Sequence, residues 1–201
     1  MKLSELIAKP TISFESIFEQ EIQLFSFTIP CQTLFTPNFE FEKDKHPPIL
    51  SDIITTLNQI HSPTLYWFET ETPDEVMHLN EELNQFRLHQ KTEDPNRRVV
   101  PAVNRNHLNQ SIEPSTTLYV GKRHEGHRKS DGLTNVSGRM VIHFGYYHKG
   151  STQGLQLAHW CSNYSGKLRL KVIALPNEAR EYLEILEKTL AKQLRPLCGQ
   201  H

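Results

Sequence analysis

Three short runs rich in β-branched and aromatic residues constrain the fold of this 201-residue chain most strongly. They are "TLYWFE" at 64–69, "TTLYVGK" at 116–122 and "KLRLKVIAL" at 167–175, and residues of these types favour β-strands. Segments with helical or loop composition separate them. This order predicts a mixed fold in which helices pack against a small sheet of three strands.

Helix signals lie between and after these runs. "TPDE" at 72–75 combines a capping threonine, a proline at the first helical position and two acids in the first turn, which predicts a helix through residue 90. Residues 123–135 are charged and contain glycine, so a flexible loop is expected there. Further helices are expected over 52–60 with Ser51 as the N-cap, over 138–147, and over 178–195 with Asn177 as the N-cap.

The charge is divided unevenly along the chain. Residues 115–201 contain 13 Lys or Arg against 6 Asp or Glu, whereas residues 1–114 contain 9 against 17. A basic half suits a phosphate-rich partner. Two differently charged, solvated surfaces would explain the same split, because charge asymmetry alone does not identify a partner.

Cysteine usage and hydropathy restrict the class of protein. Cys31, Cys161 and Cys198 are too few and too scattered for a disulfide framework, and His159 with Cys161 lacks a second ligand pair at zinc spacing. No apolar run approaches the roughly 18 residues that span a bilayer. The N-terminus also lacks the apolar core of a signal peptide. We therefore expect a cytoplasmic protein with no membrane partner.

The dipeptide Gly121-Lys122, at the end of the second run, raises the question of a phosphate-binding loop. A Walker A loop requires GxxxxGK followed by Ser or Thr. Here Arg123 follows Lys122, and no glycine stands five positions before Gly121. The sequence also carries no local signature of a Ser/His or Cys/His triad.

A different set of motifs fits a known family. The motif "TLY" at 64–66 ends on Tyr66, and the motif "YVG" at 119–121 begins with Tyr119. Both tyrosines lie in runs that are expected to form strands. "RMVIH" at 139–143 places an arginine and a histidine four apart, on one helix face. With "EKTLAKQLRP" at 187–196, these motifs resemble those of the GIY-YIG nuclease family, in particular its stand-alone bacterial members.

The resemblance implies an α/β (α+β) fold with a three-stranded, mainly antiparallel sheet flanked by helices. It covers residues 62–201, the expected nuclease domain, and residues 1–61 would form an N-terminal accessory region. Members of the family join the two tyrosine strands as a hairpin, so a helical insertion is expected at about 73–115. Gly199 stands where many members carry an asparagine.

The implied activity is metal-dependent hydrolysis of DNA phosphodiester bonds. Tyr66 would act as the general base or orient the attacking water, and its pKa, about 10 in a free tyrosine, would be lowered by nearby cations. Those cations would be Lys122, Arg139 and His143. Arg139 would hold the scissile phosphate. His143 would hydrogen-bond to Tyr66 or to the phosphate, and Tyr119 would hold the network in place.

The family's metal-binding glutamate corresponds to Glu187. It would supply the one protein ligand to a Mg²⁺ ion, for which Mn²⁺ would substitute, while water and phosphate complete the coordination shell. No organic cofactor is implied. The residues expected to contact nucleic acid are Lys122, Arg123, His127, Arg128 and Lys129.

The biological role has several readings. One reading is a restriction endonuclease, which would cut both strands as a homodimer or in two successive events, because one such site cuts one strand. Another is a repair or mobile-element nuclease that recognises DNA shape. The alternative from another class is a catalytically silent module on the same fold that binds nucleic acid or protein.

Overall fold

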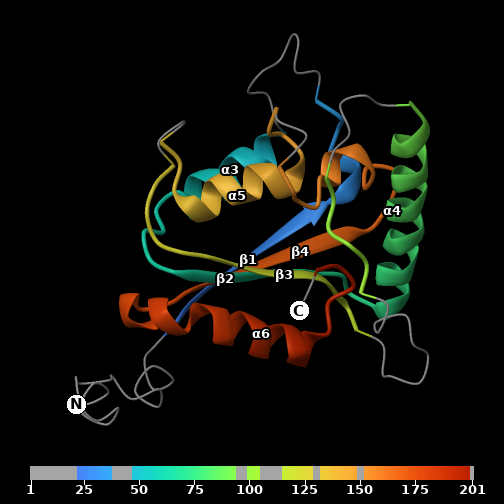
Figure 1. Ribbon diagram of the computed structural model, residues 1–201. Helices are drawn as coiled ribbons and strands as arrows, with labels where there is room; N and C mark the ends of the chain where they lie inside the picture. The colour runs from blue at the N-terminus through green and yellow to red at the C-terminus, as the bar shows by residue number, and fades with distance from the viewer. Residues whose placement is uncertain are drawn as a thin grey trace.

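The computed structural model describes residues 22–37, 47–93, 99–104, 115–128, 132–148 and 152–199. Within them a sheet runs in the order β1-β4-β2-β3, and every neighbouring pair is antiparallel (Figure 1). The α+β class and the antiparallel arrangement are confirmed, but the predicted strand number of three is wrong. The strands are β1 (Gln23–Pro30), β2 (Thr64–Glu69), β3 (Thr117–Arg123) and β4 (Lys167–Ala174).

The additional strand, β1, comes from the N-terminal region. It pairs with β4 along its whole length, from Gln23 opposite Ala174 to Pro30 opposite Lys167. Its apolar residues alternate with hydroxyl side chains in "FSFTI" at 25–29, the period of a strand with one covered face. β1 therefore shares its sheet with the segment that carries the tyrosine motifs.

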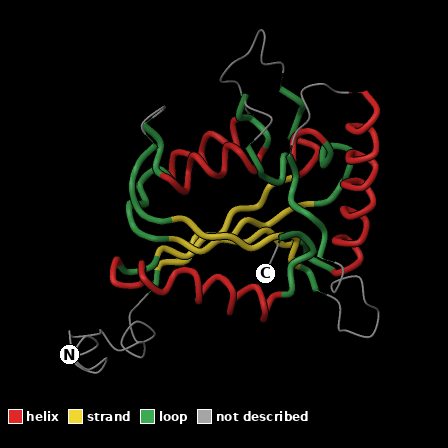
Figure 2. Tube along the Cα trace, viewed as in Figure 1, coloured by secondary structure: helices red, strands yellow, loops and turns green. Residues whose placement is uncertain are grey.

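Helices cover the two faces of the sheet unequally. α3 (Pro48–Leu57) and α5 (Asn135–Phe144) lie over one face, and α6 (Leu183–Leu194) lies over the other (Figures 1 and 2). The main core lies under α3 and α5, whereas Leu65, Trp67 and Val120 pack beneath α6. None of the helices in the described residues is long and apolar enough to cross a membrane.

The predicted start of the long helix is confirmed. α4 (Pro73–Glu93) begins with Pro73, and the Glu75 carboxylate accepts hydrogen bonds from the Glu71 and Thr72 amides at 2.8 and 2.9 Å. This carboxylate satisfies amides that have no partner within the helix. α4 stands beside the sheet, and β2 and β3 pair directly although α4 separates them in the chain (Figure 1).

Two predicted helix caps are wrong. α3 begins at Pro48 with Pro47 as its N-cap, so Ser51 lies inside the helix. Proline suits the start of a helix because its φ is fixed and the amide that it lacks would have no partner there. A 3₁₀ helix, η4 (Asn177–Tyr182), precedes α6, and its N-cap is Pro176 rather than Asn177.

α5 carries the Arg-x-x-x-His motif and begins three residues before the predicted start. The Thr134 side chain accepts a hydrogen bond from the Ser137 amide and caps it. The helix ends at Gly145, whose φ of 94° is left-handed and favours glycine. On either side of residues 129–131, which lie outside the described residues, the Asn135 amide donates to the Gly126 carbonyl and the Arg128 amide donates to the Leu133 carbonyl.

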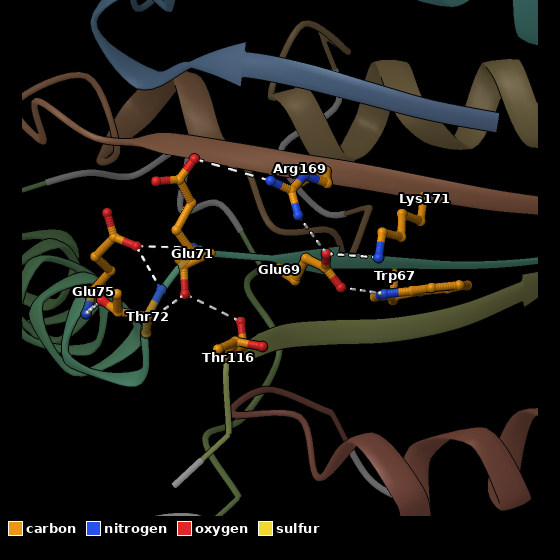
Figure 3. A network of polar contacts seen from close by, with 9 residues as sticks. Trp67, Glu69, Glu71, Thr72, Glu75, Thr116, Arg169 and Lys171 are labelled. Carbon is orange, nitrogen blue, oxygen red and sulfur yellow. Dashed lines mark hydrogen bonds and ion pairs between the residues drawn. The ribbon is translucent and has the colours of Figure 1, made fainter.

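A polar network fixes the end of β2 that adjoins α4 (Figure 3). The buried Glu69 carboxylate accepts a hydrogen bond from the Trp67 indole at 2.7 Å and pairs with Lys171 at 2.9 Å and Arg169 at 3.3 Å. Lys171 also lies over the Trp67 ring, 5.6 Å from its centroid. These contacts join β2 to β4 at the end of the sheet opposite to Thr64 and Arg123.

Candidate active site

Tyr66 lies at the centre of the candidate site. Its side chain, on the face beneath α5, is only 1% exposed. The hydroxyl oxygen lies 3.1 Å from His143 Nε2 and 3.4 Å from Arg139 Nε. The register of β2 and the four-residue spacing on α5 thus bring three predicted site residues together.

The hydrogen bonds of His143 fix its tautomer. The Leu155 amide donates to His143 Nδ1 at 3.1 Å, so the ring hydrogen of the neutral imidazole is on Nε2 and is donated to Tyr66. Burial, followed by the charges of Arg139 and Arg123, holds the pKa of His143 well below its usual range. His143 is therefore a neutral donor at physiological pH.

The expected lowering of the Tyr66 pKa is wrong for this structure. Burial and the neighbouring Tyr119 raise the pKa of Tyr66 to about 12, against the smaller lowering effects of Arg139 and Arg123. Lys122, one of the expected cations, lies on the other face of the sheet. His143 is neutral. Burial outweighs the charges because an ionised phenol loses most of its hydration there.

Gly121 makes room for the rings of Tyr66 and Tyr119, and the sequence did not predict this role of the glycine. A Cβ atom at this position would lie 2.5 Å from the Tyr66 hydroxyl oxygen and 2.9 Å from Cε1 of Tyr119. The two rings stack with centroids 6.3 Å apart, and Tyr119 lies 4.8 Å from the His143 ring. Cross-strand pairing of Gly121 with Tyr66 is the physical reason for the glycine in "YVG".

Arg139 joins this cluster to the protein surface. Its NH1 group donates to the Gln153 carbonyl, and its Nε donates to Tyr66. Tyr119 is a second side-chain hydrogen-bond partner. A guanidinium has five N–H donors. Arg139 is therefore fixed in direction and has donors remaining for a ligand.

Glu187 lies on the other face of the sheet, on α6. Its carboxylate contacts Lys122 Nζ at 2.5 Å, and Glu184 contacts the same ammonium at 3.0 Å. Successive strand residues point to opposite faces, so Lys122 faces α6 while its neighbour Arg123 faces α5. The structure therefore brings together four of the five predicted catalytic residues, and the sheet separates Glu187 from them.

The capacity of Glu187 to bind a metal depends on its second oxygen. Lys122 occupies one oxygen, and within the described part of the chain the other has no hydrogen-bond partner. One carboxylate oxygen is compatible with a Mg²⁺ ion that keeps most of its waters. Within the described residues there is no cluster of three or more His, Cys, Asp or Glu side chains that could hold a metal ion.

The residues expected to contact nucleic acid occupy different places. Arg123 and Arg128 lie with Arg139 around one pocket, and Lys122 faces α6. His127 is exposed and packs against His61, with ring centroids 4.8 Å apart. Lys129 lies outside the described residues.

Comparisons with known proteins returned no match among family models, curated proteins or solved structures. The resemblance to GIY-YIG nucleases therefore remains a prediction from the motifs. The geometry around Tyr66 and the charges beside it are the basis on which a function can be proposed.

Proposed function

We propose that this protein is a metal-dependent endonuclease that hydrolyses phosphodiester bonds in DNA. The observation that carries the proposal is the arrangement of donors around Tyr66. His143 Nε2–H and Arg139 Nε–H both point at the hydroxyl oxygen. Within the described residues the hydroxyl hydrogen has no acceptor, so it is available to a water molecule or a phosphate oxygen.

The raised pKa favours an orienting role for Tyr66. With a pKa of about 12, only about one molecule in 10⁵ is ionised at pH 7 in the absence of substrate. Tyr66 would therefore position the attacking water by its hydrogen bond. His143 and Arg139 would stabilise any negative charge that develops on the phenol oxygen as the reaction proceeds.

Arg139 would hold the scissile phosphate. In the structure its Nε donates to the buried Tyr66 hydroxyl, so a phosphate bound by the remaining guanidinium donors would lie close to Tyr66. The planar guanidinium donates two parallel hydrogen bonds to phosphate oxygens and stabilises their charge in the transition state.

Glu187 would bind the metal ion, which supplies charge neutralisation for the leaving oxygen when bound. β3 is an edge strand, and Arg123 at its end is electrostatically coupled both to Glu187 and to the tyrosines. A nucleic-acid strand that passes this edge would reach groups on both faces of the sheet. This position supports a shared role for residues that the sheet separates.

One observation favours the alternative of a binding module without catalysis. The carboxylate of Glu187 is already paired with Lys122, as expected for a residue that stabilises the packing of α6 on β3. Metal dependence distinguishes the two functions, because a binding module has no need of the ion.

The test is nicking of supercoiled plasmid with Mg²⁺ or with EDTA by wild type, Glu187→Ala and Glu184→Ala. Glu184 is the matched control, since it lies on the same helix and pairs with the same lysine. We expect Mg²⁺-dependent nicking that falls by roughly 10²-fold or more in Glu187→Ala and stays near wild type in Glu184→Ala. No cutting of plasmid, branched DNA or RNA by wild type would favour the binding module.

A further inference from the structure

Beside the tyrosine cluster lies a pocket of about 260 Å³ with an unusual lining. Three arginines from β3, the following loop and α5 surround it, and none of its described lining residues is acidic. The acid nearest in sequence, Glu125, pairs with Arg180 at 2.7 Å instead. The lining residues are Arg123, His124, Arg128, Asn135, Arg139 and Ile142.

Arg123 has no direct acidic partner in the described part of the chain. Its side chain is mostly buried, and it has neither a hydrogen bond nor an ion pair there. Burial lowers the pKa of Arg123 overall, although Tyr66, Tyr119 and Glu187 raise it, and the like charge of Arg139 also lowers it. An unpaired cation is costly to bury, so the position of Arg123 is best explained by an anionic ligand.

Arg128 is held in place by its surroundings. Its NH1 group donates to the Gly138 carbonyl at 2.9 Å, and its guanidinium lies 5.0 Å from the centroid of the Tyr147 ring. Gly138 is needed for this approach, because a Cβ atom there would lie 2.2 Å from Cδ of Arg128. The protein thus orients Arg128 towards the pocket lining at a defined position rather than leaving it on the surface.

We infer that this three-arginine pocket binds a second phosphate group of the nucleic-acid substrate, beside the phosphate that Arg139 would hold for cleavage. Guanidinium groups bind phosphate oxygens with paired N–H donors. Asn135 is also the first residue of α5, whose N-terminal end adds partial positive charge. The inference rests on the proposed function for the identity of the ligand as a nucleic acid, but phosphate binding requires neither metal nor cleavage.

The phosphate has two possible sources, an internal phosphodiester and a terminal phosphate. The experiment is fluorescence anisotropy of a labelled 20-base-pair duplex, with a 5′-phosphate or a 5′-hydroxyl, in EDTA and over a range of NaCl concentrations. The proteins are wild type, Arg123→Gln, Arg128→Gln and, as control, Lys167→Gln. Lys167 is exposed at the opposite end of the sheet.

We expect Arg123→Gln and Arg128→Gln each to weaken binding several-fold and to lower the slope of log K against log salt by about 0.9, with Lys167→Gln unchanged. Weaker binding of both duplexes by the variants identifies an internal phosphate. Weaker binding of the 5′-phosphorylated duplex alone identifies a terminal phosphate. Equal slopes for Arg123→Gln and Lys167→Gln would overturn the inference.

Two controls keep the outcome interpretable. Arg123→Lys retains the charge and should retain the slope, which separates loss of charge from loss of folding; thermal melting of each variant checks the fold. If the protein binds the duplex through the pocket but does not cut DNA, the proposed nuclease function is wrong while the inferred phosphate site stands.

Discussion

The Nε2 atom of His143 lies 3.1 Å from the hydroxyl oxygen of Tyr66, a residue 77 positions away in the chain. The Leu155 amide occupies the other ring nitrogen, so His143 donates to Tyr66 and stays neutral. This relationship determines what Tyr66 can do, because it adds a hydrogen-bond donor to the phenol oxygen without adding a charge.

The buried state of His143 predicts an acid-sensitive stability. The pKa of His143 is held well below its unfolded value near 6.5, so the unfolded chain binds a proton that the folded chain excludes. The stability contributed by neutral His143 is present above pH 6.5 and is lost as pH falls below it. Urea unfolding of wild type and His143→Gln between pH 4.5 and 8 should show a difference that shrinks towards low pH. A constant difference would contradict this state of His143.

The raised pKa of Tyr66 predicts a loss of stability at alkaline pH. Its folded pKa of about 12 exceeds the unfolded value of 10.0, so the unfolded chain releases a proton that the folded chain retains. Stability is fully present below pH 10 and declines by roughly 2–3 kcal/mol as pH rises to 12. Other buried groups also titrate in this range. The measurement is therefore the difference in the free energy of unfolding between wild type and Tyr66→Phe across this pH range. Tyr66→Phe should lack the part of the decline that comes from Tyr66.

Gly121→Ala should displace the Tyr66 ring. The new Cβ would lie within 2.6 Å of both Cζ and the hydroxyl oxygen, and overpacking of this kind destabilises by roughly 1–3 kcal/mol. Thermal unfolding measures the cost, and cleavage should fall in parallel. In a Tyr66→Ala background the same substitution should cost less, because the nearer of the two clashing rings is gone and only the 2.9 Å contact with Tyr119 remains. Equal costs in both backgrounds would mean that Gly121 acts elsewhere.

The ion pair between Lys122 and Glu187 predicts competition with metal binding. Lys122→Gln removes a cation 2.5 Å from the carboxylate, and we expect Mn²⁺ to bind about five-fold more tightly by calorimetry without DNA. The substitution should have no effect in a Glu187→Gln background. Unchanged Mn²⁺ affinity in the single variant would place the metal away from Glu187.

The sequence predicts strands and helix starts where local chemistry decides them. The runs around Tyr66 and Tyr119 favour strands by composition, and Thr72 with Glu75 marks a helix start whatever surrounds it. The alternation of Phe25, Ser26 and Phe27 was a signal for β1 that the irregular flanking sequence obscured. The predicted domain boundary between residues 61 and 62 stays a prediction, while β1 and α3 lie in the common sheet and core.

Properties that depend on tertiary structure were not predictable. Lys122 and Arg123 are neighbours in sequence, yet the pleat sends one to Glu187 and the other to the arginine pocket. The raised pKa of Tyr66 follows from burial under α5, which the sequence does not specify. The role of Gly121 required the register of β2 against β3, which long-range pairing determines.

The most direct test of the proposed function is the rate at which Tyr66→Phe nicks supercoiled plasmid in Mg²⁺, measured beside wild type and Tyr146→Phe. Tyr146 is the matched control, since its hydroxyl accepts from the amide and donates to the carbonyl of Phe35, which is not a candidate site residue. We expect nicking by wild type and by Tyr146→Phe, and a loss of roughly 10²-fold or more in Tyr66→Phe. Equal rates in wild type and Tyr66→Phe would contradict the role of Tyr66 in cleavage.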